Sequence, residues 1–322
     1  MESIEYFAQI INKKLGKKVV DYSELLSGRS QNKKYKINTD TGEEYLVRTV
    51  KTQDINRHFD ACVNLYSKNA QIAKPVCILS EPECVEMVEW VRGDCISFSR
   101  DTSYLDSIKL GILAGNAIKS VHQVTVGAGI IRPDIKSELN HYKEIIGRRE
   151  VSFSYKTEIM RKLDEGADYL GEVCRKSYVH MDIHSHNMVF SQLKNKIILI
   201  DCENMSITDP WRDFSYATCF HDNEENLFWY SALLRYFDHN IPDEFWVASR
   251  IYSGIQILRI LIHEHEYFPH SFEEKAKQIG NSFFWQYLSD DNIKPKWAAR
   301  IEKNTCEIIS LINSVSSGEN RK

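Results

Sequence analysis

The chain has 322 residues, of which 43% are hydrophobic and 27% charged, and its formal net charge is -4. This composition is that of a globular protein with one large domain or two modest ones, and it excludes a disordered or fibrous chain. The weakly acidic balance lacks the positive field that attracts a polyphosphate backbone, so we expect no nucleic-acid partner.

The cysteines and the apolar runs both favour a cytoplasmic protein. The eight cysteines are widely spaced and include no Cys-x-x-Cys pair, which is typical of reduced thiols. Residues 1–18 have apolar side chains at helical spacing but carry Glu2 and Glu5, so they predict an amphipathic helix rather than a signal peptide. The apolar run 255–262 contains Arg259 and is much shorter than the roughly 20 residues that a transmembrane helix needs, so we expect no membrane segment.

The first part of the chain alternates strand-forming runs with one long helix. Two β-rich runs, 34–38 and 45–50, are joined by a Thr-Asp-Thr-Gly turn, which predicts a hairpin. Residues 54–69 have apolar side chains at helical spacing, and the following run 76–79 predicts a second hairpin with the segment VEMVEWV. We therefore expect residues 1–93 to form a small β-rich lobe.

The rest of the chain is mainly helical. Helical spacing predicts long helices over residues 105–122, 135–146 and 156–175, with aromatic-rich helices over 213–265 and 273–288. Three short β runs interrupt this pattern between residues 177 and 204. We expect a second lobe over residues 94–313 and a flexible polar tail over 314–322.

The β-rich interruption contains most of the side chains with catalytic chemistry. In YVHMDIHSHNMVF, Asp182 and Asn187 stand five residues apart between two β runs, and Asp201 ends the next strand. This order resembles the catalytic core shared by aminoglycoside phosphotransferases, choline kinases and protein kinases. The resemblance implies an α+β, two-lobed, protein-kinase-like fold. It also implies that Asp182 is the catalytic base for an acceptor hydroxyl and that Asn187 and Asp201 bind Mg²⁺.

Neighbouring positions follow the same family pattern with two departures. Met181 stands where these phosphotransferases usually have glycine, and in ITDPWRDF Thr208 replaces the glycine of the family's Gly-Asp-Pro segment. The resemblance implies that Asp213 braces the catalytic loop by accepting backbone hydrogen bonds near His180. His180 is then a structural anchor of that loop.

The N-terminal lobe supplies the nucleotide part of the resemblance. The segment LLSGRSQNKKYKI resembles the phosphate-covering hairpin of the choline-kinase-like branch, which implies that backbone amides of Ser27, Gly28, Arg29 and Ser30 cradle phosphates of ATP or GTP. An ordinary hairpin turn is the alternative. Arg48 occupies the position of the phosphate-binding lysine, and its guanidinium can bind phosphate oxygens bidentately.

Two further positions follow from the same alignment. The segment INRHFD resembles the start of the helix whose carboxylate pairs with the phosphate-binding cation, which implies an ion pair between Asp60 and Arg48. A solvated position on the helix is the alternative for Asp60. The segment VEMVEWVRG resembles the hinge between the lobes, where backbone groups of Glu89 and Val91 would bind the adenine edge.

The resemblance implies a small-molecule kinase that transfers the γ-phosphate of ATP or GTP to a hydroxyl group of an aminoglycoside-like or other small acceptor. A choline, amino-alcohol or sugar kinase of the same fold is the alternative. The C-terminal region has both acidic and aromatic side chains, which suit a cationic acceptor, so the sequence leaves the acceptor open.

Two hypotheses belong to other classes of protein. One is a metal-dependent hydrolase, because imidazoles and a carboxylate alternate at His180, Asp182, His184 and His186. It leaves Asn187 unexplained. The other is a non-catalytic nucleotide-binding module, which does not require the base and both metal ligands that the sequence retains.

Overall fold

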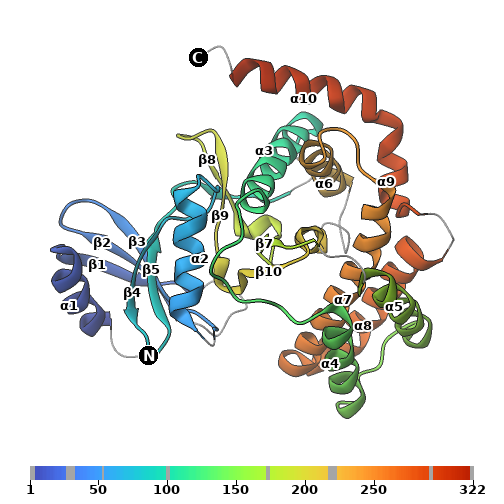
Figure 1. The fold of residues 1–322 in the computed structure, drawn as a ribbon, viewed down its shortest axis with the longest axis horizontal. Helices are drawn as coiled ribbons and strands as arrows, with labels where there is room; N and C mark the ends of the chain where they lie inside the picture. Colours follow the sequence, from blue (N-terminus) through green and yellow to red (C-terminus); the bar gives the residue numbers. More distant parts are fainter. Residues whose placement is uncertain are drawn as a thin grey trace.

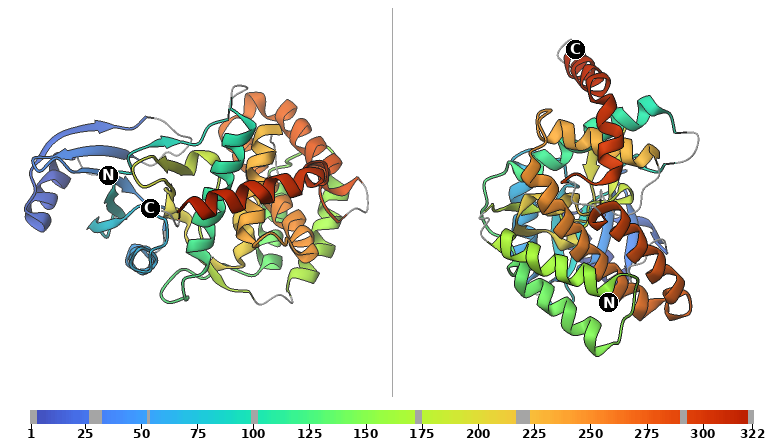
Figure 2. Two further views of the ribbon diagram at one scale, coloured as in Figure 1. Left: turned by 90° about the horizontal axis from the view of Figure 1, so that it is seen from above. Right: turned by 90° about the vertical axis from the view of Figure 1, so that its right-hand side faces the viewer.

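The computed structural model describes residues 4–26, 33–52, 54–98, 102–171, 175–216, 223–289 and 293–319. They form a β-rich N-terminal lobe and a larger, mainly helical C-terminal lobe, which lie at opposite ends of the molecule (Figures 1 and 2). The two-lobed α+β architecture predicted from the sequence is confirmed.

The N-terminal lobe is a five-stranded antiparallel sheet with the strand order β1-β2-β3-β5-β4. Its strands are β1 (Val19–Glu24), β2 (Lys34–Thr39), β3 (Glu44–Thr49), β4 (Pro75–Ser80) and β5 (Val85–Glu89). The first predicted hairpin is β2–β3, in which Lys34 lies opposite Arg48. Alternate residues of β2 are buried, which is the period-2 pattern that places every second side chain on the core face.

Two helices flank this sheet. Helix α1 (Ile4–Leu15) buries Ile4, Phe7 and Ile11 in a cluster with apolar side chains of the strands. Helix α2 (Ile55–Ser67) begins at Asp54, whose side chain accepts a hydrogen bond from the backbone N–H of Arg57 and caps the helix. Helix α1 thus belongs to the core of the small lobe, whereas the buried apolar residues of α2 join the cluster that continues into the C-terminal lobe.

The chain crosses between the lobes at Gly93. Strand β5 ends at Glu89, and β6 (Asp94–Cys95) already pairs with β8 (Met188–Ser191) of the C-terminal lobe. Gly93 has φ +146°, and a Cβ atom there would lie 2.2 Å from the carbonyl oxygen of Phe190. Only glycine fits such a close approach at this backbone conformation. The predicted division after residue 93 falls between the two strands.

The C-terminal lobe is built from eight α-helices in the part of the chain that the structure describes. They are α3 (Tyr104–His122), α4 (Ile135–Arg148), α5 (Lys156–Gly171), α6 (Asn223–Tyr236), α7 (Asp243–Tyr267), α8 (Phe272–Phe283), α9 (Lys296–Ile301) and α10 (Thr305–Glu319). Gly111 and Gly115 of α3 face α6 so closely that a Cβ atom would lie 2.3 Å and 2.5 Å from backbone oxygens of that helix. The two helices form the centre of the lobe's upper half (Figure 1).

Two helix boundaries differ from the sequence-based expectation. Residues 210–214 form a 3₁₀ turn instead of the start of a helix, because Asp209 caps that turn through its side chain and Pro210 follows it. At the other end, α10 continues to Glu319, although the sequence predicted a flexible tail from residue 314. This helix runs beside α3 and α6 (Figure 1).

Helix α7 is the central helix of the lower half of the lobe. By length and composition it could span a membrane, but 72% of its most apolar window is buried inside the protein. Packing against the neighbouring helices therefore accounts for its apolar character.

Four short strands hold the segment between residues 177 and 208 in place. They are β7 (Ser177–Val179), β8 (Met188–Ser191), β9 (Lys196–Leu199) and β10 (Ser206–Thr208). Strand β8 pairs with β6 and β9, whereas β7 pairs with β10. The loop that carries Asp182 leaves β7 and enters β8, and Asp201 follows β9, so the strands bring both residues to the same edge of the C-terminal lobe.

Candidate active site

A buried carboxylate anchors the loop between β7 and β8. Asp213 is 2% exposed, and its two oxygens accept hydrogen bonds from the backbone N–H groups of His180 (2.9 Å) and Met181 (2.7 Å). His122 of α3 lies 2.9 Å from the same carboxylate through Nε2. The His180 ring is fully buried, and its Nε2 lies 2.8 Å from the carbonyl oxygen of Ile200. The end of β9 is thereby tied to the start of the loop.

Met181 has a left-handed backbone, with φ +70°. A non-glycine residue in this conformation costs about 1 to 2 kcal/mol, which explains why the family pattern has glycine here. The hydrogen bond to Asp213 holds the strained residue, and Arg259 of α7 donates to the Met181 carbonyl oxygen at 3.3 Å. The backbone is thus fixed on both sides of the position before Asp182.

Asp182 and Asn187 contact each other. The Asn187 side chain donates from Nδ2 to the Asp182 carbonyl oxygen (2.9 Å) and to Asp182 Oδ2 (3.3 Å). The backbone N–H of Ile200 donates to the Asn187 carbonyl oxygen at 3.0 Å, which brings Asn187 beside the residue before Asp201. The Asp182 side chain keeps 20% of its surface exposed, so an incoming molecule can reach its carboxylate.

Asp201 joins the two lobes. It lies at the end of β9 with φ +62°, a conformation that aspartate tolerates better than most residues. Arg48 donates to its Oδ1 at 2.6 Å and Lys34 to its Oδ2 at 2.9 Å. Burial acts to raise the pKa of Asp201, but the positive charges of Arg48 and Lys34 outweigh it, and the pKa lies below its ordinary value. The carboxylate is therefore ionised at neutral pH.

Arg48 also belongs to a buried ion network within the N-terminal lobe. It is 3% exposed and donates from Nε (2.9 Å) and Nη2 (2.7 Å) to Glu86 Oε1. The other Glu86 oxygen lies 3.5 Å from Nε2 of His58 on α2. Burial acts to raise the pKa of Glu86, but Arg48 and His58 lower it to about 2. Two carboxylates, Glu86 and Asp201, thus share the Arg48 guanidinium.

The structure corrects the predicted partner of Arg48. Asp60 is exposed on α2, whereas His58, Cys62 and Leu65 of that helix are buried. Because residues four and seven positions after His58 share its face, a residue two positions after it points to the opposite side. The ion pair of Arg48 with Asp60 was therefore wrong, and Glu86 of β5 takes the place of that partner.

The structure describes the two predicted hinge residues but not the predicted phosphate-binding residues. The backbone N–H of Glu89 donates to the Lys74 carbonyl oxygen at 2.8 Å, so this N–H group is already engaged within the N-terminal lobe. Val91 follows at a half-buried position. The four residues Ser27, Gly28, Arg29 and Ser30 lie outside the described residues.

The donor atoms near Asp201 suit Mg²⁺. Carboxylate and amide oxygens are hard ligands, and Mg²⁺ is commonly held by one or two carboxylates together with substrate phosphates. Because both Asn187 hydrogen bonds use Nδ2, the amide oxygen is left available as a ligand. Asn187 and Asp201 could therefore hold the metal of a nucleotide complex.

The histidines of the loop do not converge on a second metal centre. In the described part of the chain, no group of three or more His, Cys, Asp or Glu side chains is arranged to hold a metal ion. The His184 and His186 ring centroids are 6.0 Å apart, and His184 Nε2 lies 3.8 Å from Asp182 Oδ2. The hydrolase hypothesis finds no support in this geometry.

Three residues of the site escaped the sequence-based prediction. Lys34 lies opposite Arg48 in the predicted hairpin, so correct strand register would have found it. Glu86 and Arg259 are ionisable residues inside otherwise apolar runs, which is a signal that each needs a partner. Nothing in the sequence identifies those partners, because they lie on distant elements.

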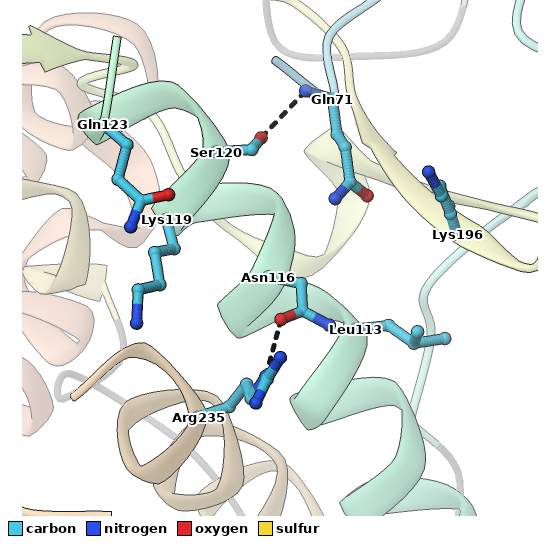
Figure 3. A pocket seen from close by; sticks show the side chains of 8 residues that line it. All are labelled: Gln71, Leu113, Asn116, Lys119, Ser120, Gln123, Lys196 and Arg235. Atoms are coloured by element: carbon cyan, nitrogen blue, oxygen red, sulfur yellow. Dashed lines mark hydrogen bonds between the residues drawn. The ribbon is translucent and has the colours of Figure 1, made fainter. Parts of the chain in front are cut away.

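A separate cavity of 380 Å³ lies beside α3 and α6 (Figure 3). Hydrogen bonds of Asn116 with Arg235, and of Ser120 with the backbone of Gln71, cross its wall. Its lining includes none of the candidate catalytic, metal-binding or nucleotide-binding residues, and it therefore lies outside the candidate active site.

Comparison with known proteins identifies the family. A sequence model described as the phosphotransferase enzyme family matches residues 21–247. The chain belongs to this family. It is therefore a phosphotransferase that acts on a hydroxyl acceptor. The comparison with curated proteins found no match.

Solved structures with the same fold include several small-molecule kinases. Choline kinase LicA from Streptococcus pneumoniae is 15% identical, with a TM-score of 0.62 over 87% of this chain and 98% of that chain. A spectinomycin phosphotransferase in complex with ADP and spectinomycin is 11% identical, with a TM-score of 0.60 over 95% of this chain and 98% of that chain. Amicoumacin kinase, in complex with AMP-PNP and Ca²⁺, is 15% identical, with a TM-score of 0.61 over 89% of this chain and 95% of that chain. At these identities the likeness shows the fold.

Proposed function

We propose that this phosphotransferase transfers the γ-phosphate of ATP or GTP to a hydroxyl group of a small acceptor, with Asp182 as the catalytic base. The observation that carries the proposal is the contact between Asp182 and Asn187 at the edge where Asp201 meets two cations of the other lobe. A base, two oxygen ligands for a metal and two positive charges for phosphates are the parts that phosphoryl transfer requires.

In the proposed reaction the acceptor oxygen forms a bond to the γ-phosphorus, and the bond from that phosphorus to the bridging β–γ oxygen breaks. The acceptor proton moves to Asp182, and the nucleoside diphosphate leaves with the electron pair of the broken bond. Mg²⁺ held by Asn187 and Asp201 would neutralise charge on the phosphates. Asp182 is exposed enough to meet the hydroxyl, while its hydrogen bond from Asn187 fixes the orientation of the carboxylate.

The cations of the N-terminal lobe would bind the nucleotide. Lys34 and Arg48 now share the Asp201 carboxylate, and both can contact phosphate oxygens when a metal joins that carboxylate. Backbone groups of Glu89 and Val91 would bind the adenine edge, and residues 27–30 would bind the phosphates. A cytoplasmic location remains a prediction from the cysteine pattern.

Membership of the family does not determine the chemical class of the acceptor. The similar structures are named for choline, spectinomycin and amicoumacin, so an aminoglycoside-like acceptor, a choline or amino-alcohol acceptor and a sugar are all compatible with the fold.

Direct binding and turnover test the proposed function. Calorimetry with ATP and GTP, with and without Mg²⁺, should detect metal-dependent binding to the purified chain. A panel of hydroxylated acceptors, followed by mass spectrometry of the products, should then detect a product that is heavier by one phosphoryl group. Absence of metal-dependent nucleotide binding would contradict the proposal.

A further inference from the structure

A small cavity lies next to the catalytic loop, on the side away from the N-terminal lobe. It measures 190 Å³, and Met181 forms part of its wall. Helix α7 contributes Tyr252, Ile255, Gln256 and Arg259, which share one face at helical spacing. Drug-sized ligands usually occupy about 300 to 1,000 Å³, so this space suits a small acceptor or one end of a larger acceptor.

Arginines dominate the charge of this cavity. Its lining contains Arg132, Arg212 and Arg259, but one carboxylate, Glu138. Arg212 donates to Glu138 Oε2 at 2.5 Å, and the Tyr142 hydroxyl donates to Glu138 Oε1 at 3.2 Å. Both oxygens of Glu138 are thus engaged, and the pair with Arg212 is neutral. The wall of the cavity therefore supplies no free carboxylate for the other two arginines, Arg132 and Arg259.

Among the residues that the structure describes, Arg132 has no acidic partner. Its Nε donates to the Ser206 hydroxyl at 3.2 Å, and among the described residues no carboxylate lies within salt-bridge distance of its guanidinium. Burial lowers the pKa of Arg132; Glu138 acts to raise it, whereas the charges of Arg212 and Arg259 lower it further. The guanidinium is therefore in a setting that favours an anion from outside the protein.

Arg259 connects the cavity to Asp182. Its Nη1 donates to the Met181 carbonyl oxygen at 3.3 Å, and its Nη2 lies 3.7 Å from Asp182 Oδ1. The second distance is too long for a hydrogen bond. A ligand that binds Arg259 consequently lies within a few ångströms of the proposed base.

A neutral donor in the same wall is also without a partner. Gln256 is 6% exposed, and its Nε2 is buried with no hydrogen-bond partner in the described structure. A buried amide group without a partner costs about 1 to 3 kcal/mol, so such groups usually meet a ligand or water. Gln256 thus supplies a donor in the same wall as the guanidinium groups of Arg132 and Arg259.

Resting on the proposed phosphotransferase function, we propose that the acceptor carries an acidic group, a carboxylate or a phosphate, which binds Arg132, Arg259 and Gln256. Its hydroxyl group then lies at Asp182. The acceptor is thus an anionic hydroxylated small molecule such as a hydroxy acid, a sugar acid or a sugar phosphate. This differs from the cationic acceptor that the acidic and aromatic side chains of the C-terminal region suggested.

Turnover with charged acceptors tests the proposal. The whole chain with MgATP should phosphorylate hydroxy acids, sugar acids or sugar phosphates in preference to choline, aminoglycosides and uncharged sugars. Comparing the acceptors that carry a carboxylate with those that carry a phosphate shows which acidic group the site binds. Arg132→Gln should raise KM for the preferred anion by about 10- to 100-fold with a much smaller effect on kcat, because a charge-assisted hydrogen bond is lost. Arg132→Lys should recover part of the loss. Preference for a cationic or uncharged acceptor, with a KM that Arg132→Gln leaves unchanged, would overturn the proposal.

The matched control is Arg149→Gln. Arg149 lies at the C-terminal end of α4 and pairs with Glu266 on an exposed part of the surface. This substitution removes the same charge without touching the cavity, so KM should stay at the wild-type value. An equal rise in KM in both variants would show a general effect of charge, and the proposed contact would be wrong.

A binding experiment covers the case in which no member of the panel is phosphorylated. With the nucleotide site saturated by MgADP, inorganic phosphate and malate are titrated separately by calorimetry. At least one anion should bind wild type and Arg149→Gln alike, and bind Arg132→Gln at least about tenfold more weakly. If neither anion binds wild type, or if Arg132→Gln binds as wild type does, the proposal fails. Loss of MgADP binding itself would instead contradict the proposed function.

A second variant separates the contact from folding. Gln256→Glu keeps the shape of the side chain and adds a carboxylate to the wall that holds Arg132 and Arg259. It should lose anion binding while its unfolding temperature stays equal to or above that of wild type, because the carboxylate supplies the missing charge from within. Retained anion affinity in this variant would contradict the proposed site.

Discussion

The two sides of Asp182 differ in how their arginines are balanced. On the nucleotide side, Arg48 is buried between Glu86 and Asp201, and both carboxylates lie within hydrogen-bond distance. On the opposite side, Arg132 contacts a hydroxyl group, and the nearby Glu138 is engaged by Arg212. A buried cation that is paired with carboxylates of the same chain stabilises the fold. One without them is better placed to bind a ligand than to stabilise the fold.

The largest effect is expected at the residue between these two sides. Asp182→Asn keeps the shape of the side chain but cannot accept the hydroxyl proton, so kcat should fall by about 10²- to 10⁴-fold, or roughly 3 to 5 kcal/mol of barrier. Nucleotide affinity and the urea midpoint should hardly change. Product formation within about threefold of the wild-type rate would show that Asp182 is not the base.

The same substitution on each side tests the comparison directly. Arg48→Gln leaves Glu86 buried with only His58 beside it, and the free energy of unfolding should fall by about 3 to 5 kcal/mol. Arg132→Gln removes a cation without a carboxylate partner, so it should change stability by no more than about 0.5 kcal/mol or increase it. Urea denaturation of both variants measures the difference. Equal losses in the free energy of unfolding would mean that Arg132 stabilises the fold as much as Arg48 does.

A second control concerns the corrected partner of Arg48. Asp60→Asn changes an exposed carboxylate and should stay within about 0.5 kcal/mol of wild type in the same urea experiment. A loss comparable to that of Arg48→Gln would instead favour the ion pair expected from the sequence.

The pH dependence of stability should report the Glu86 network. The folded pKa of Glu86 is about 2, below its ordinary value of 4.5, so its stabilising contribution is present above about pH 4.5 and is lost as the pH falls toward 2. The size of this contribution is on the order of 3 kcal/mol. Asp201, whose pKa is also lowered, changes stability in the same direction. Glu86→Gln should lower stability at neutral pH and flatten the acid limb of urea midpoints measured at successive pH values; an unchanged acid limb would exclude Glu86 as its source.

A more modest effect is expected on nucleotide affinity. Asp201→Ala removes the proposed carboxylate ligand, so calorimetry should show at least about a tenfold weaker affinity for ATP in the presence of Mg²⁺. Without Mg²⁺ the affinity should fall less or even rise, because Lys34 and Arg48 are released from Asp201. Unchanged affinity with Mg²⁺ would contradict the metal assignment.

The sequence by itself determined the fold class and the order of the catalytic segment. The spacing of Asp182, Asn187 and Asp201 is a local property, because each lies within a few residues of a short strand that its own apolar neighbours define. The hairpin that carries Lys34 and Arg48 is local for the same reason. Patterns of this kind can be read from the sequence without knowledge of how distant elements pack.

Only the tertiary structure decided which charges meet. Glu86 rather than Asp60 reaches Arg48, because the rotation of α2 against the sheet turns Asp60 toward solvent while β5 lies directly beside β3. Arg132 and Arg259 come together, across more than a hundred residues of sequence, because the segment before α4 pairs with β10 and α7 packs against α4. Electrostatic interactions fall steeply with distance and depend on burial, and neither quantity can be read from sequence spacing when the partners lie on separate elements.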